Sequence, residues 1–215
     1  MSRIDLSSHR MIQQKILERK PQVKLEVQFP EIGRIADVVD FQKKLIYEVQ
    51  YSPITVREAR KRNEDYASLG FQVIWVLHNK TFNKKKATPA EFYLRHHTMF
   101  YTSYTRFGHG FFFDQLEFFR GRRRIYRGVP LPLTSLDPRP LLEIPKNFPK
   151  SLKKKLIRTP YYFPGDATDD LFRKGNELWA KELEKSYLGI ASRFDSKLYR
   201  SILTKSAAPH VSLEG

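Results

Sequence analysis

The sequence predicts an α/β fold in which a helix, three strands, a second helix and a fourth strand follow one another. Three observations predict it: apolar and polar residues alternate over 23–29, two β-branched runs flank a polar connection within 35–49, and helix start and stop signals bracket 56–69. These elements define a predicted core of residues 1–100.

The N-terminal elements follow from local patterns. A short amphipathic helix is predicted first, capped by Ser7 or Ser8. The first strand, residues 23–29, would place Val23, Leu25, Val27 and Phe29 on one face. The next two strands, residues 35–39 and 45–49, are joined by a connection of hairpin length, which predicts a meander.

The second helix carries the clearest boundary signals. Thr55 and Glu58 form a T-x-x-E capping-box pattern, and Gly70 stands where helices commonly end in a left-handed residue. A helix over 56–69 is therefore predicted. A β-branched and aromatic run at 71–77 then predicts the fourth strand.

Two acids, Asp37 and Glu48, lie near the ends of two adjacent apolar strands, where polar groups rarely occur without a use. Converging carboxylates bind Mg²⁺ or Mn²⁺, and the backbone carbonyl of Val49 would be a third ligand. Strand periodicity sends Gln50 to the face of Glu48, where its amide could orient an attacking water. The alternative is a structural pair, with each acid bound to Arg34 or a helix arginine.

Arg62 and Tyr66 lie four residues apart on the edge of the second helix, from which they could face Glu48 and Gln50. One interpretation is that they contact nucleic acid. The other is an arginine that extends along the helix surface and a tyrosine packed in the core.

The order of elements, with the segments R-I-A-D-V-V, Y-E-V-Q-Y-S-P-I-T, R-N-E-D-Y and W-V-L, resembles the nuclease domain of the competence-protein CoiA family. That family belongs to the restriction-endonuclease-like, or PD-(D/E)xK, superfamily. The resemblance covers roughly residues 9 to 80. It implies a metal-dependent DNA nuclease core in which Asp37 and Glu48 match the metal-binding acids. Gln50 matches a position that many relatives fill with lysine.

The resemblance also implies further candidates. Glu26 matches an acid common on the first strand, although the alternation sets it on the polar face, and Glu18 is a possible helix-borne acid. Arg62 and Tyr66 have the spacing of a Q-x-x-x-Y element, with arginine in place of glutamine. Fuller members of the family carry a preceding cysteine-containing domain that this sequence does not show.

The composition is strongly basic. Thirty-nine lysines and arginines against twenty-three acidic residues give a formal net charge of +16 and a pI near 10.0. Such a charge favours a polyanionic partner without separating DNA binders from ribosome-associated or membrane-surface proteins. The absence of cysteine excludes disulfides and thiolate sites. Since no membrane span or signal-peptide core is found, we expect a cytoplasmic protein with no membrane partner.

The rest of the chain divides by composition. Residues 101–128 predict an aromatic and arginine-rich β-hairpin turning at Gly121, whose phenylalanines cover the core. Its arginines are candidate nucleic-acid contacts: Arg120, Arg122, Arg123 and Arg124. Three further segments are predicted: a proline-rich linker or strap at 129–165, a helical region at 166–206 and a disordered tail at 207–215.

The predicted function is a metal-dependent DNA nuclease that uses Mg²⁺ or Mn²⁺ and processes or recombines incoming DNA. Recombination or DNA-uptake proteins are candidate partners, and the oligomeric state is left open. One alternative is a catalytically inert, basic DNA-binding module with the same fold. Another is an RNA-binding protein that uses the aromatic hairpin. The carboxylates of Asp37 and Glu48 must share an ion for catalysis, whereas an arginine between them favours the inert module.

Overall fold

The computed structural model describes residues 3–115, 117–127, 130–133, 135–138 and 161–162. The predicted helical region and tail, and most of the proline-rich segment, lie outside these residues. The chain divides into two compact units, and the first comprises Met1–Asp114, Arg122–Arg124 and Pro132–Pro140. No helix in the described part of the chain is long and apolar enough to cross a membrane.

The described chain contains both helices and strands, and helices separate β3 from β4 and β4 from β5. In chain order they are α1 (Arg3–Arg19), β1 (Lys24–Phe29), the 3₁₀ helix η1 (Pro30–Ile32), β2 (Arg34–Asp40), β3 (Leu45–Gln50), α2 (Val56–Ser68), β4 (Gln72–His78), α3 (Pro89–Leu94), β5 (Met99–Thr102), β6 (Phe112–Asp114), β7 (Glu117–Arg120), β8 (Arg123–Arg127), β9 (Leu131–Pro132) and β10 (Tyr161–Tyr162).

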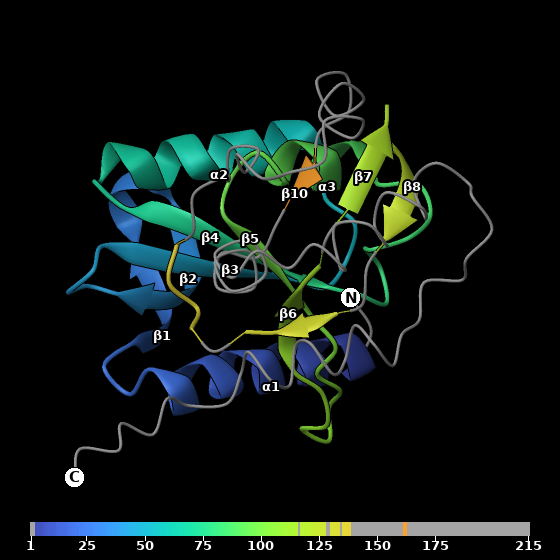
Figure 1. Cartoon of the computed structure of the whole chain (residues 1–215). Coiled ribbons are helices and arrows are strands. Elements are labelled where there is room, and N and C mark those ends of the chain that lie inside the picture. The colour runs from blue at the N-terminus through green and yellow to red at the C-terminus, as the bar shows by residue number, and fades with distance from the viewer. Residues whose placement is uncertain (1–2, 116, 128–129, 134, 139–160, 163–215) are drawn as a thin grey trace, which may run out of the picture. The chain divides into compact units, whose positions relative to one another are not determined.

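The larger sheet is mixed and has the strand order β1-β2-β3-β4-β5-β6-β9. Strands β1, β2 and β3 form the predicted antiparallel meander, and α2 connects β3 to its parallel neighbour β4. Helices α1 and α2 lie on opposite faces of this sheet (Figure 1). Each face has its own apolar core, which we call the α1-side core and the α2-side core.

Helix α2 begins and ends almost where the sequence predicts. The Thr55 hydroxyl accepts the Glu58 N–H at 3.1 Å, but the Glu58 carboxylate binds arginines, so only half of the predicted capping box forms. At the other end, Gly70 has φ 77°, and its N–H donates to the Ala67 carbonyl at 2.9 Å. The helix therefore ends through a left-handed glycine.

Helix α1 starts earlier than predicted, at Arg3 rather than after Ser7 or Ser8. Ser8 faces inward and is 3% exposed, on the same side as the fully buried Ile12 and Ile16. A serine cap contributes only about 1 kcal/mol, so it does not by itself fix where this helix begins.

Strand β1 does not keep one apolar face, and that prediction is wrong. Val23 and Leu25 pack in the α1-side core, whereas Val27 and Phe29 pack in the α2-side core. The exchange occurs at Glu26, which has φ 51° in the left-handed region. A left-handed residue rotates the strand and interrupts the period of two on which the prediction rests.

Within the segment predicted as a hairpin, β7 and β8 are neighbours in a three-stranded sheet of order β10-β7-β8, whereas β6 pairs with β5 in the larger sheet. Gly121 lies at the turn with φ 56°. Of the preceding phenylalanines, Phe112 belongs to the α1-side core and Phe113 to the α2-side core. These two rings are therefore core residues, as expected.

Candidate functional site

Asp37 lies where β2 separates from β3. The paired register of the two strands runs from Asp40 opposite Leu45 to Val38 opposite Tyr47, and Asp37 is the next residue. Its carboxylate oxygen Oδ2 accepts a hydrogen bond from the Val49 N–H at 2.7 Å. The carboxylate thus occupies the gap between the strands and is held by the backbone of β3.

Helix α1 brings two more polar groups to Asp37. The Nε2 atom of His9 lies 3.2 Å from Asp37 Oδ2. Gln13, one turn later and 2% exposed, donates from Nε2 to Glu26 Oε1 and lies 3.5 Å from Asp37 Oδ1. The candidate ligand atoms of His9, Glu26 and Asp37 all lie within 4.8 Å of one another. We call these three residues the His9–Glu26–Asp37 cluster.

The negative charges around His9 favour a positive charge in the cluster. Burial alone would lower the pKa of His9, but the hydrogen bond to Asp37 and the negative charges of Asp37, Glu26 and Glu48 raise it. In this structure a protonated imidazole would balance the acids. A divalent ion bound by the same atoms would replace that proton.

Glu48 lies on the other side of the sheet, facing α2, and is 1% exposed. Tyr66 donates its hydroxyl to Oε1 at 2.7 Å, and Arg62 donates from Nη1 to Oε2 at 2.5 Å. Burial and then the charge of Asp37 raise the pKa of Glu48 to about 7, against the opposing effects of Arg62 and Tyr66. The two predicted acids therefore interact electrostatically, although they bind different partners.

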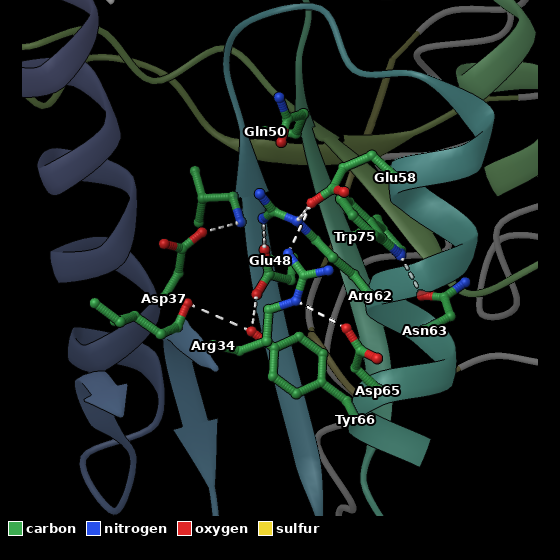
Figure 2. Close-up of polar contacts among 12 residues, drawn as sticks. Arg34, Asp37, Glu48, Gln50, Glu58, Arg62, Asn63, Asp65, Tyr66 and Trp75 are labelled. Carbon is green, nitrogen blue, oxygen red and sulfur yellow. Dashed lines mark hydrogen bonds and ion pairs between the residues drawn. The ribbon is translucent and has the colours of Figure 1, made fainter. Parts of the chain in front are cut away.

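Arg62 also belongs to a chain of ion pairs between the sheet and α2. It contacts Glu58 at 2.9 Å, and Glu58 contacts Arg34 at 2.8 Å. Arg34 in turn binds Asp65 at 2.9 Å. Figure 2 shows this chain on the α2 side of the sheet and Asp37 on the α1 side. Glu48 is therefore paired with a helix arginine, as in the structural alternative, whereas the ion-pair partner of Asp37 among the described residues is His9.

Other predicted site residues lie around this centre. The Gln50 amide donates to the Ser52 carbonyl at 2.6 Å and is not drawn into the cluster. Val49 contacts Asp37 through its N–H, not through the carbonyl expected as a ligand. Glu18 is exposed and pairs with Lys15 at 2.7 Å. Among these residues, only Val49 touches the His9–Glu26–Asp37 cluster.

The candidate nucleic-acid residues differ in exposure. The Tyr66 ring is fully buried, so the structure places it in the core, and the Arg62 side chain is 29% exposed. Arg122 and Arg123 are exposed, whereas Arg124 is 6% exposed and its guanidinium binds Glu91. Arg120 lies at the end of β7, and its side chain is outside the description.

A cleft opens beside the cluster. It has a volume of about 410 Å³ and lies between α1 and β1. Its lining residues are Leu6, His9, Arg10, Gln13, Gln14, Leu25 and Glu26. Since His9 and Glu26 belong to both the cluster and the lining, a ligand in the cleft would contact the cluster.

Sequence reasoning missed His9 and Gln13. The only available signal was their spacing of four on one helix, which places both side chains on one face. Nothing in the sequence shows that this face meets Asp37, because that contact depends on how α1 packs across the sheet.

The mixed α/β arrangement of these elements fits an α/β nuclease-like fold. Residues 6–119 match the sequence model of the family described as "Competence protein CoiA, nuclease-like domain", which is more than half of the 215-residue chain. The chain belongs to this family, and the resemblance found in its sequence is confirmed. No curated protein and no solved structure matches the chain significantly.

Proposed function

We propose that the protein hydrolyses phosphodiester bonds in DNA with the help of a divalent metal ion. The observation that carries the proposal is the His9–Glu26–Asp37 cluster, whose three candidate ligand atoms lie within 4.8 Å of one another and two of whose residues, His9 and Glu26, line a cleft. Membership of a nuclease-like family and the net charge of +16 support it.

The donor set fits a hard or borderline divalent ion. Two carboxylates suit Mg²⁺ or Mn²⁺, and the imidazole favours Mn²⁺ over Mg²⁺. When bound, such an ion would supply an activated water and stabilise charge on the phosphate. His9, Glu26 and Asp37 would hold it, with Gln13 fixing Glu26 and the Val49 N–H fixing Asp37.

Glu48, which faces α2 and is not part of the His9–Glu26–Asp37 cluster, would act from the neighbouring strand. Its pKa of about 7 allows it to gain or lose a proton near neutral pH, as a general base or acid requires. Arg62 contacts Glu48 and is partly exposed, so it could also pair with a phosphate oxygen when the substrate enters. Gln50, from the end of β3, would join this group by releasing the Ser52 carbonyl.

One observation favours the inert DNA-binding module as a second candidate. Both carboxylate oxygens of Glu48 have donors, and one donor is the guanidinium of Arg62. If this pair is permanent, Glu48 takes no part in chemistry. The protein would then bind DNA without cutting it.

The test combines cleavage with metal binding. Wild type, Asp37→Asn and Glu48→Gln are incubated with linear duplex, single-stranded and branched DNA, with Mg²⁺, with Mn²⁺ and with chelator. Mn²⁺ binding is measured separately by calorimetry. Glu64→Gln, an exposed acid on α2, is the matched control.

We expect metal-dependent cleavage by wild type and by Glu64→Gln, and loss of cleavage in the other two variants. Asp37→Asn should also lose Mn²⁺ affinity. Equal cleavage by wild type and Asp37→Asn would refute the proposal. A folded wild type that binds DNA but cuts none would select the inert module.

A further inference from the structure

Two basic segments that are far apart in the sequence lie side by side in the first unit. Lys86 forms an antiparallel bridge with Arg123. The Ala87 N–H donates to the Arg122 carbonyl at 2.8 Å, and the Arg124 N–H donates to the Lys85 carbonyl at 2.9 Å. The lysine run at 84–86 and the arginine pair at 122–123 therefore form one continuous surface. We call these five residues the basic ridge.

A buried network of hydrogen bonds and an ion pair holds the backbone beneath the ridge. Arg124 turns inward, where its guanidinium binds the Lys84 carbonyl, the Glu91 carboxylate and the Tyr101 hydroxyl. Glu91 is fully buried and also accepts hydrogen bonds from the Asn83 N–H at 2.8 Å and from Tyr101 at 2.8 Å. This network fixes the backbone on both sides of the ridge, because its members come from both segments.

The charges of the ridge itself face solvent. All five side chains are exposed, and among the described residues no carboxylate forms an ion pair with any of them. Arg122 makes one long hydrogen bond, 3.5 Å, to the Ala87 carbonyl. The acid nearest in the network, Glu91, is already paired with Arg124. Five positive charges are thus concentrated on a fixed backbone, and no carboxylate in the described part of the chain is paired with them.

We infer that the basic ridge is a binding surface for the phosphate backbone of duplex DNA. This rests on the proposed function for the identity of the polyanion. Lysine and arginine side chains without an aromatic ring among them suit phosphates rather than bases. A duplex presents one negative charge per about 1.7 Å of axis, so it can satisfy several closely spaced cations at once. The ridge would hold the duplex independently of the metal cluster.

The test is DNA binding by the full chain in chelator, so that no cleavage is needed. Fluorescence anisotropy with a short labelled duplex is measured over about 0.05 to 0.2 M salt. The variants are Lys84→Gln/Lys85→Gln/Lys86→Gln and Arg122→Gln/Arg123→Gln. The matched control, Lys24→Gln/Lys44→Gln/Lys61→Gln, removes three exposed lysines outside the ridge. Circular dichroism and thermal unfolding verify that each variant is folded.

Each lost phosphate contact should lower the slope of log Kd against log salt by about 0.9. We expect the lysine triple variant to lower the slope by about two to three and to weaken binding about tenfold or more at low salt, with a much smaller change in the control. Equal losses of duplex affinity in the ridge and control variants would overturn the proposal. A wild type that does not bind duplex would overturn it as well. If the ridge substitutions weaken binding of single-stranded RNA more than binding of duplex DNA, duplex DNA is the wrong ligand.

Cleavage by the same variants separates the two proposals. A wild type that cuts nothing but binds duplex through the ridge would refute the nuclease and keep the ridge. If wild type cuts DNA and the ridge variants cut and bind duplex as well as wild type does, the nuclease is kept and the ridge is refuted.

Discussion

Glu26 and Asp37 lie opposite each other in the β1–β2 ladder, between the pairs Leu25–Val38 and Val27–Ala36. Both strands exchange faces at this point. In β2, Ala36 packs in the α2-side core and Val38 in the α1-side core, as Val27 and Leu25 do in β1. The coupled irregularity brings the two carboxylates together beside α1, so the cluster owes its form to a break in strand periodicity.

The left-handed backbone at Glu26 can be tested by a pair of substitutions. Glu26→Val places a β-branched residue at φ 51°, whereas Glu26→Gly suits that conformation. Because a left-handed side-chain-bearing residue costs about 1–2 kcal/mol, we expect the valine variant to be less stable than the glycine variant by about that amount. Urea unfolding measures the difference. Higher stability of the valine variant would mean that β1 is regular at this position.

Gln13 should act as a positioning residue for the cluster. Gln13→Leu removes the amide that donates to Glu26. The leucine side chain is similar in size to the glutamine that it replaces. Loss of such a supporting hydrogen bond lowers metal affinity by about 10–100-fold. We expect this loss in Mn²⁺ calorimetry, while Gln14→Leu, at an exposed neighbouring position, binds Mn²⁺ as wild type does. Unchanged affinity in Gln13→Leu would show that Glu26 needs no such support.

The His9 imidazole should make metal binding depend on pH. Its pKa is raised above 6.5, so the proton that occupies it at low pH must leave before the nitrogen can bind an ion. Mn²⁺ affinity should therefore increase as pH rises from about 6 to about 8. His9→Gln should flatten this dependence, measured by calorimetry at each pH. The same steep dependence in both proteins would exclude His9 as a ligand.

The raised pKa of Glu48 should make the folded protein less stable as pH rises. Its pKa is about 7 in the folded protein against 4.5 in the unfolded chain, so the folded state binds more protons between these values. Its contribution to the free energy of unfolding is present below 4.5 and is lost as pH rises through 7. Relative to Glu48→Gln, wild type should lose stability in urea unfolding from about pH 5 to about pH 8, with Glu64→Gln as control. If the difference in free energy of unfolding between wild type and Glu48→Gln does not change with pH, the pKa of Glu48 is the same in the folded and unfolded protein.

The sequence by itself determined the order of the elements and the boundaries of α2. Capping and periodicity are local properties, so Thr55, Gly70 and the apolar runs were sufficient. It also placed Asp37 and Glu48 on adjacent strands and pointed to the family, because these depend on spacing along the chain, although Asp37 lies in the middle of β2 rather than near its end.

Only the tertiary structure decided which side chains meet. Periodicity assumes regular strands, so it could not foresee that a left-handed Glu26 would bring Glu26 and Asp37 to α1. The contact of His9 with Asp37 and the burial of Arg124 against Glu91 join residues distant in the sequence. Such contacts depend on packing across the sheet, which no local pattern encodes.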